Sequence, residues 1–501
     1  MKIENHNIHI NNFDQNENRV KTREFNGRKL IIKSYAKSEN KHQPQSEHLL
    51  NTERLKLELH SFFDKYKFLK RNTSSQTGNI IKLSKNDKAP DILQNSNHRF
   101  QFEKNKVTDI TFIHSIKQHK LDIKKISDEI TLNLPDRTQM HSINVKKYLD
   151  NRLSSLVVNT ARSYGCEFFC GGNYSALSHH YQGRGFDSIK EISSNTSTKS
   201  YYVTNTTTGK NVLVLSNMNS EARIKHQLLQ LHYADIDISK INISGSIKMQ
   251  KENAMMQLSS VLNTLPDADK KVLFIGARWQ IMEFLGREIY QIDENQPEGV
   301  GYDKMNTTQH KVSGFIFDTA IVENQENNER YIFSGLRMPN GDLSYDATKA
   351  FIEAGFTYIV MCGAGGRLSG KAKIGDYTPI NISIYENEAI NLKMEDMKIP
   401  DGTFIEELLS TNITVNSPLE ETQKWLENNK HHSSVDVETG HIFRAVSEAI
   451  DNQKSVTITP GLFISDVVGE HPLEGKISTD DAYKNLKGFV ASIWHSAIKT
   501  S

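Results

Sequence analysis

Apolar runs of strand length alternate with helical patterns from residue 268 to residue 501, and this alternation restricts the fold more than any other feature of the sequence. Five runs have the composition of buried strands: VLFIG at 272–276, GFIFDTAIV at 314–322, YIFSG at 331–335, TYIVMCG at 357–363 and SVTITPGLFIS at 455–465. Helical spacing of apolar residues occurs at 281–289, 344–355, 440–450 and 481–498. The alternation predicts a three-layer α/β/α domain, in which ligands gather at the carboxyl ends of the strands.

The first 124 residues have a different composition, rich in Asn, Lys, Ser and Gln. Residues 1–100 contain 19 lysines and arginines against 11 acidic residues, whereas the whole chain contains 61 and 60. We expect a flexible, basic leader with one helix near 48–70. The charge asymmetry is too weak to predict nucleic-acid binding.

Neither a Sec-type signal peptide nor an apolar run long enough to span a membrane is evident in the sequence. The expectation is a soluble protein that is cytoplasmic or exported without a cleaved signal. An uncleaved leader rich in Asn and Ser is also typical of bacterial effectors that are injected into host cells, so export is a hypothesis.

Residues 125–267 predict a smaller α/β or α+β region of unknown role. The segment 199–217 has the pattern of a β-hairpin, and 221–233 and 253–265 have helical spacing. Cys166 and Cys170 lie near His179 and His180, an arrangement compatible with a zinc site or a Cys/His nucleophile. With only three cysteines in the chain and no recognisable spacing of metal ligands, buried thiols are the favoured interpretation.

Three polar or glycine-rich motifs follow predicted strands of the C-terminal domain. The first is a glycine loop within MCGAGGRLSGKAKIGD at 361–376, the second is SSVDVETGH at 433–441, and the third is FISDVVGEH at 463–471. A period of two places Asp436 and Glu438 on the same side of an extended segment. Helix capping is the alternative role for Asp436, Glu438 and Asp466. The candidate site residues are Gly363, Ala364, Gly365, Gly366, Asp436, Val437, Glu438, Ser465 and Asp466, with Arg278 as a further anion-binding candidate.

In this order and spacing, the motifs resemble those of the purine nucleoside phosphorylase and nucleosidase superfamily, and most closely the methylthioadenosine/S-adenosylhomocysteine nucleosidases. The resemblance covers 268–501 and implies cleavage of a purine N-glycosidic bond without a metal or redox cofactor. It implies that Asp466 protonates the leaving base and that Glu438 binds the ribose hydroxyls, with Asp436 as a weaker partner. The glycine loop would line the base and the ribose, and a homo-oligomer would be expected.

The sequence departs from the family pattern at several positions. Met361 stands where phosphorylases carry a phosphate-binding arginine, and this change favours hydrolysis. Ile281 occupies the position of the water-activating glutamate, with Glu283 two residues away. Val415 and Asn416 stand where an aromatic residue usually stacks on the base.

The favoured function is therefore a nucleosidase that releases a base, most simply adenine, from a purine nucleoside or nucleotide. One alternative is a phosphate-dependent phosphorylase that uses Arg278 or Arg337 in place of the missing arginine. The other is a non-catalytic effector that binds a nucleotide, since fold alone does not fix function.

Overall fold

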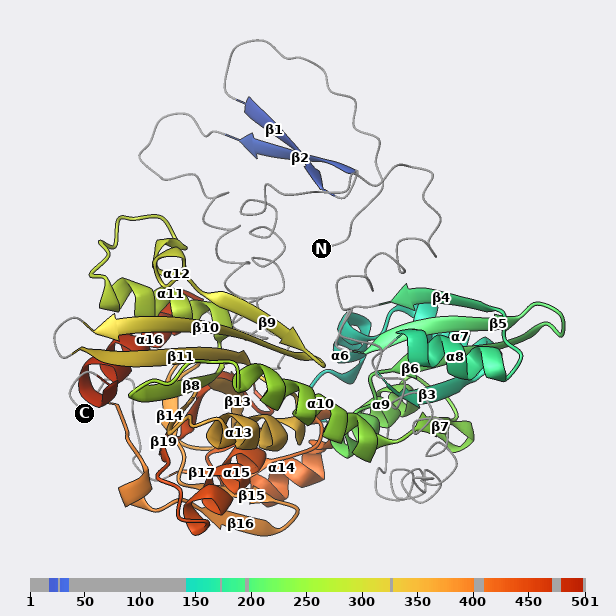
Figure 1. Ribbon diagram of the computed structural model, residues 1–501. Helices are drawn as coiled ribbons and strands as arrows, with labels where there is room; N and C mark the ends of the chain where they lie inside the picture. Colours follow the sequence, from blue (N-terminus) through green and yellow to red (C-terminus); the bar gives the residue numbers. More distant parts are fainter. Residues whose placement is uncertain are drawn as a thin grey trace. The chain divides into compact units, whose positions relative to one another are not determined.

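The computed structural model describes residues 18–25, 28–35, 141–171, 174–193, 198–324, 328–400, 410–470 and 479–498. The chain forms two units, Met1–Lys56 and Leu57–Ser501. In the first unit, β1 (Asn18–Phe25) and β2 (Arg28–Tyr35) form an antiparallel pair (Figure 1). The helix expected near 48–70 lies outside the described residues.

A six-stranded sheet forms the first half of the C-terminal domain, in the order β19-β12-β8-β11-β10-β9. The neighbours from β19 to β11 pair in parallel, whereas β10 and β9 are antiparallel additions at one edge. The strands are β8 (Lys270–Gly276), β9 (Thr308–Val312), β10 (Phe315–Asn324), β11 (Glu329–Arg337), β12 (Tyr358–Met361) and β19 (Thr457–Thr459). Each strand predicted from 272 to 361 is present in this sheet.

A seven-stranded sheet forms the second half, in the order β14-β20-β13-β18-β17-β15-β16. β13 pairs in parallel with β20 on one side and antiparallel with β18 on the other. The strands are β13 (Gly363–Arg367), β14 (Tyr377–Pro379), β15 (Ile382–Tyr385), β16 (Glu388–Asn391), β17 (Thr411–Thr414), β18 (Ser434–Asp436) and β20 (Gly461–Val467).

Two chain segments run through both sheets and join them. Cys362 alone separates β12 from β13, and Pro460 alone separates β19 from β20. The end of β8 lies against this junction, because a Cβ built on Gly276 would be 2.2 Å from the carbonyl oxygen of Cys362. Gly276 also has a φ of +134°, a backbone conformation that residues other than glycine rarely adopt. The seam between the sheets is therefore tightly packed backbone.

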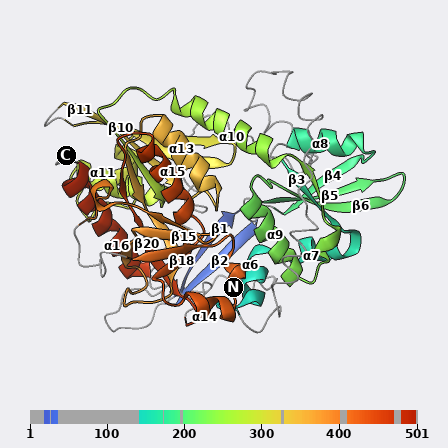
Figure 2. The ribbon, with the colours of Figure 1, turned by 90° about the horizontal axis from the view of Figure 1, so that it is seen from below.

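Helices cover both faces of the six-stranded sheet, as Figures 1 and 2 show. One face packs on α11 (Arg278–Ile289) and α16 (Thr479–Ser492), through side chains such as Phe284 and Phe489. The other packs on α10 (Ile247–Leu262), α13 (Leu343–Glu353) and α15 (Thr439–Asp451), through side chains such as Leu258, Phe351 and Phe443. This arrangement confirms the predicted α/β fold with helices on both faces.

Residues 141–245 form a separate α/β layer structure, which we call the middle lobe. Its sheet has the order β4-β5-β6-β3-β7, with parallel pairing around β3 and the predicted hairpin at β5 and β6. The elements are α6 (Val145–Arg152), α7 (Ser155–Tyr164), β3 (Cys166–Cys170), α8 (Tyr174–Gly183), β4 (Ser188–Ser193), β5 (Lys199–Asn205), β6 (Lys210–Ser216), α9 (Glu221–Tyr233) and β7 (Asn242–Gly245). Cys166 and Cys170 are both buried free thiols of β3, and burial raises the pKa of Cys170 to about 12.

The middle lobe and the C-terminal domain share contacts within the second unit. Leu419, in the short helix η4 (Pro418–Glu420), belongs to the apolar core of the lobe. Conversely, Ala254, Leu258 and Leu262 of α10 pack in the C-terminal core, although they precede residue 268. Within the described ranges, every helix is too short or too polar to cross a membrane.

Candidate active site

The predicted glycine loop is an extended strand at 363–367, β13, and this corrects the expectation of a loop there. Its glycines are required by packing and not by a left-handed backbone: the positive φ values of this region fall at Gly370 and Gly375. A Cβ on Gly365 would be 2.7 Å from the carbonyl oxygen of Val435. A Cβ on Gly366 would be 2.5 Å from Cγ2 of Val468 and 3.2 Å from Oδ2 of Asp466. Glycine therefore lets β18 and β20 close on β13.

The strand pairing brings the two acidic motifs to opposite sides of β13. Gly366 pairs with Val435 of β18 and with Asp466 of β20. With a strand spacing of about 4.8 Å, the backbones of the two motifs are separated by about 10 Å. Asp436 stands at the carboxyl end of β18 and Asp466 near that of β20, but β18 runs antiparallel to β13 whereas β20 runs parallel to it, so the two motifs approach β13 from opposite directions.

Asp436 ends β18 and caps the following helix. Its carboxylate accepts hydrogen bonds from Thr439 N at 3.0 Å, Thr439 Oγ1 at 2.6 Å and Thr414 Oγ1 at 3.1 Å. Burial raises the pKa of Asp436 to about 6, against the lowering effect of these bonds. The extended segment therefore ends at Asp436, and the capping role that the sequence left open is the one this carboxylate performs.

Glu438 lies at the turn from β18 into α15 and is 7% exposed. Gly341 N, in the loop between β11 and α13, donates a hydrogen bond to Glu438 Oε1 at 3.4 Å. Burial, and then the neighbouring charge of Asp436, raise the pKa of Glu438 well above its ordinary value. Backbone hydrogen bonds from Gly341 and Val437 act on this carboxyl group, which can also accept hydrogen bonds from hydroxyl groups of a ligand.

Asp466 is buried near the end of β20, and Ser465 Oγ donates a hydrogen bond to its Oδ1 at 2.6 Å. A β-bulge at Ser465 shifts the register of β20 against β13. Bulges re-aim side chains at functional sites. Asp466 and its neighbour Ser465 are thus held between β13 and the edge strand β14, with Asp466 beside Gly366.

Glu421 is a second buried acid near Asp466, and none of the sequence motifs indicated it. Burial and the charge of Asp466 raise the pKa of Glu421 to about 8. Ser142, in the segment before α6, donates from Oγ to Glu421 Oε2 at 3.0 Å, and Ser142 N donates to the backbone oxygen of Glu421. The only sequence signal was its place in the loop after the strand at 411–414.

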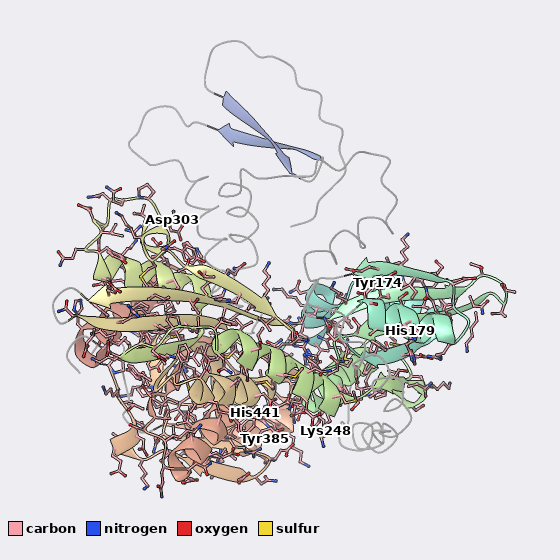
Figure 3. The ribbon with its side chains drawn as sticks, in the orientation of Figure 1. Tyr174, His179, Lys248, Asp303, Tyr385 and His441 are labelled. Carbon is pink, nitrogen blue, oxygen red and sulfur yellow. The ribbon has the colours of Figure 1, made fainter. Side chains whose placement is uncertain are left out.

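The first turn of α15 adds an aromatic and imidazole pair (Figure 3). The ring of His441 packs at 4.4 Å from that of Tyr385, whose hydroxyl donates to Asn416 Oδ1 at 3.0 Å. Burial lowers the pKa of His441 to about 4, so the imidazole is neutral at pH 7. Tyr385 is an aromatic residue near Asn416, one of the positions at which the sequence lacks the expected aromatic side chain.

Arg278 follows β8 directly and forms a buried ion pair with Asp318 of β10. Tyr302 donates a second hydrogen bond to Asp318 Oδ2 at 3.0 Å. Burial raises the pKa of Asp318, while the guanidinium group of Arg278 lowers it. The structure thus gives Arg278 a partner within the protein, and its proposed contact with a substrate anion remains a prediction.

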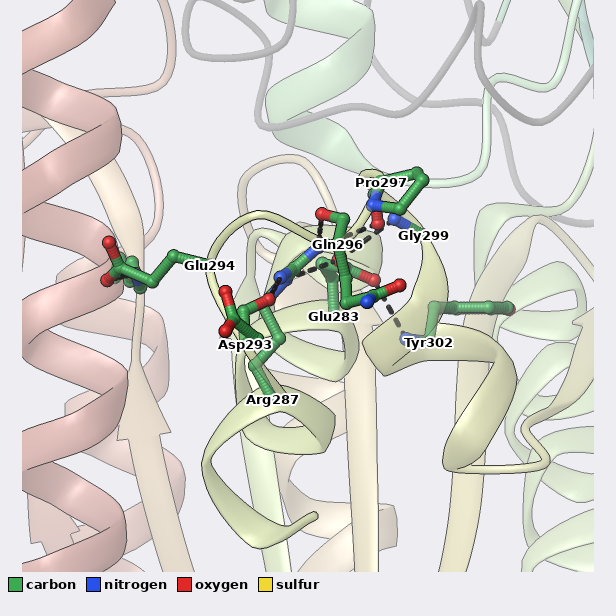
Figure 4. Close-up of polar contacts among 9 residues, drawn as sticks. Glu283, Arg287, Asp293, Glu294, Gln296, Pro297, Gly299 and Tyr302 are labelled. Carbon is green, nitrogen blue, oxygen red and sulfur yellow. Dashed lines mark hydrogen bonds and ion pairs between the residues drawn. The ribbon is translucent and has the colours of Figure 1, made fainter. Parts of the chain in front are cut away.

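Glu283 has a structural role in the loop after α11 (Figure 4). Its carboxylate accepts hydrogen bonds from Gly299 N at 2.9 Å, Tyr302 N at 2.8 Å and Arg287 Nε at 2.8 Å. Ile281, at the position of the water-activating glutamate, is fully buried in the apolar core. Neither side chain can therefore take the role of that glutamate.

Besides Asp436 and Glu421, the described site contains two buried carboxyl groups, Glu438 and Asp466, on either side of a strand whose first four residues are glycine and alanine. Glu421, next to Asp466, is protonated at neutral pH because its pKa is about 8. Ala364 and Val437 are partly buried at the same strands. Such a set of residues can hold a flat, polar ligand, bind hydroxyl groups at one end and supply a proton at the other.

The C-terminal half is similar in fold to solved structures of a futalosine hydrolase and of 5′-methylthioadenosine/S-adenosylhomocysteine nucleosidases. One is a futalosine hydrolase mutant of Helicobacter pylori, at 13% identity, with 44% of this chain and 98% of that chain covered and a TM-score of 0.30. Two are 5′-methylthioadenosine/S-adenosylhomocysteine nucleosidases. That of Colwellia psychrerythraea, in complex with adenine, is 13% identical, with 45% of this chain and 91% of that chain covered and a TM-score of 0.28. That of Neisseria meningitidis is 16% identical, with 45% of this chain and 98% of that chain covered and a TM-score of 0.29.

No family model matches the sequence, and no curated protein matches it either.

Proposed function

We propose that the C-terminal domain hydrolyses the N-glycosidic bond of a purine nucleoside or nucleotide. The observation that carries the proposal is the placement of Asp466 on β20 and of Glu438 two residues after β18, the two strands that pair with β13. The motif resemblance assigns these two residues to the ribose and to the base. The geometry supports that division, because one carboxyl group lies on each side of the glycine strand.

The proposed reaction breaks the bond between the sugar C1′ and the base nitrogen. The bonding electron pair goes to the base, and Asp466, in its protonated form, donates a proton to the leaving base at N7 and becomes a carboxylate. Glu438 accepts hydrogen bonds from the ribose hydroxyls while positive charge develops on the sugar. Water then adds to C1′ and releases its proton to solvent.

Hydrolysis is proposed in preference to phosphorolysis because of Met361. Its side chain is almost fully buried and carries no charge, so it cannot pair with phosphate. Among bases, adenine is proposed as the product from the resemblance. Export as an effector is supported only by the composition of the leader, and assembly into a homo-oligomer only by the resemblance. Both stay predictions.

The decisive experiment measures free-base release by chromatography from adenosine, inosine, methylthioadenosine, AMP and NAD, each with and without phosphate. We expect release without phosphate from at least one of them, and its loss in Asp466→Asn and Glu438→Gln. Glu388→Gln is the matched control, since Glu388 is an exposed carboxylate on β16 that pairs only at the surface with Arg444.

Two results would contradict the proposal. Release that depends strictly on phosphate would identify a phosphorylase. Ligand binding without release from any of these compounds would identify a non-catalytic binding domain.

A further inference from the structure

The first turn of α9, in the middle lobe, lies against the loop between β11 and α13. In that loop, the amide of Gly341 donates a hydrogen bond to Glu438. Ser220 is fully buried and caps α9, and its Oγ accepts a hydrogen bond from Arg223 N at 3.2 Å. The Cβ of Ala222 is 3.3 Å from a Cβ built on Gly341, whose amide donates to Glu438. Ala222, the neighbour of Arg223, thus contacts Gly341, and Gly341 binds Glu438. These two contacts place Arg223 near the sugar end of the proposed site.

Basic groups gather around this loop. Arg337 ends β11, just before the loop, and Lys251 Nζ lies 3.0 Å from both Asp342 Oδ2 and Asp346 Oδ2. Burial lowers the pKa of Arg223 to about 10; Asp342 raises it and Arg337 lowers it, so both guanidinium groups and Asp342 are within electrostatic reach. The three cations are Arg223, Arg337 and Lys251, and the two carboxylates are Asp342 and Asp346. Lys251 forms ion pairs with both carboxylates.

Two buried side-chain nitrogens, one on α9 and one on α15, have no hydrogen-bond partner among the described residues. Nε2 of Gln227, one helical turn after Arg223 on α9, belongs to a side chain that is 4% exposed. Nε2 of His441, one turn after Glu438, belongs to a side chain that is 3% exposed. A buried polar atom without a partner costs on the order of 1–3 kcal/mol, so a ligand that supplies a hydrogen-bond partner would be stabilised there.

We propose that the substrate carries a phosphate on its sugar, that Arg223 and Arg337 bind this phosphate, and that Gln227 donates to it. The substrate class is then a purine nucleotide, and the middle lobe contributes the specificity. Arginine suits this role because its planar guanidinium group binds phosphate oxygens in pairs. This inference rests on the proposed function for the placement of the sugar near Glu438.

The test compares the binding of AMP and adenosine to the full chain by calorimetry, with Asp466→Asn as background so that ligand is not consumed. We expect AMP to bind more tightly than adenosine. Arg223→Gln should weaken AMP binding about 10- to 100-fold, the usual value of a charge-assisted hydrogen bond, and leave adenosine binding unchanged. Arg162→Gln, on α7 of the same lobe, is the matched control and should leave both affinities unchanged.

Adenosine binding reports whether Arg223→Gln keeps the fold of the site. Equal affinities for AMP and adenosine would overturn the proposal, and so would an equal loss of both in Arg223→Gln. A further arm adds inorganic phosphate to the wild-type protein with adenosine: stimulation of base release that Arg223→Gln abolishes would assign the arginines to free phosphate and also overturn it.

The outcomes for the two proposals are separable. Binding of AMP that depends on Arg223, without base release by the wild-type protein, would refute the nucleosidase and keep the phosphate site. Equal release from adenosine and AMP that is insensitive to Arg223→Gln would keep the nucleosidase and refute the phosphate site.

Discussion

Replacing Glu421 by glutamine isolates the energetic consequence of burying an acid next to Asp466. The pKa of Glu421 is raised from 4.5 to about 8 in the folded protein, chiefly by burial and then by the charge of Asp466. Between these two values the native state keeps the proton and the unfolded chain releases it. The free energy of unfolding therefore falls as pH rises through this window.

The size of the effect follows from the two pKa values. Each pKa unit corresponds to about 1.4 kcal/mol, so the wild-type protein loses about 4 kcal/mol through this group between pH 5 and pH 9. The amide introduced by Glu421→Gln would resemble the protonated acid at every pH. The stability of Glu421→Gln relative to wild type should thus increase by about 4 kcal/mol over the same range.

Urea unfolding of both proteins at pH 5, 7 and 9 measures this difference. Any lost or altered hydrogen bond with Ser142 would add a constant offset, whereas the pH dependence of the difference belongs to the titrating carboxyl group. Glu420→Gln is the neighbouring control, because Glu420 forms an ion pair with Lys225 at 3.1 Å. A difference between Glu421→Gln and wild type that stays constant from pH 5 to pH 9 would refute the reasoning.

Two further substitutions test the packing of the seam and of the first sheet. Gly276→Ala should destabilise the protein by more than about 3 kcal/mol, because its Cβ would meet the carbonyl oxygen of Cys362 and its φ disfavours alanine; an unfolding midpoint in urea close to that of wild type would contradict this. Asp318→Asn should cost about 3–5 kcal/mol by leaving the Arg278 guanidinium group buried without its counter-charge. Thermal unfolding measures it, and a stability equal to wild type would show that the pair is energetically neutral.

The α/β fold of the C-terminal domain could be predicted because its strands and helices have simple signatures. Runs such as 272–276 and 358–361 are continuously apolar because these parallel strands are buried on both faces. The helix at 344–355 was recognisable by its apolar face and its terminal glycine. In these segments, local pattern and tertiary environment agree.

Pairing between distant segments explains what the sequence could not predict. The glycines at 363–366 have the composition of a turn, and only the close approach of β18 and β20 makes them a strand. Likewise, the period of two predicted that Asp436 and Glu438 lie on the same side of an extended segment. Hydrogen bonds from Thr439 and Thr414 instead hold Asp436 as a helix cap. Glu421 has no motif of its own, since its raised pKa comes from burial and from Asp466, which lies far along the chain.

The order of the strands in the chain has a consequence for protein synthesis. β13 pairs with β20, which the ribosome makes about a hundred residues later, and Asp466 arrives only with β20. Before then, β13 lacks one neighbour and exposes an unpaired strand edge of glycine and alanine. The proposed proton donor and the closure of the second sheet are therefore completed in the same late step of synthesis.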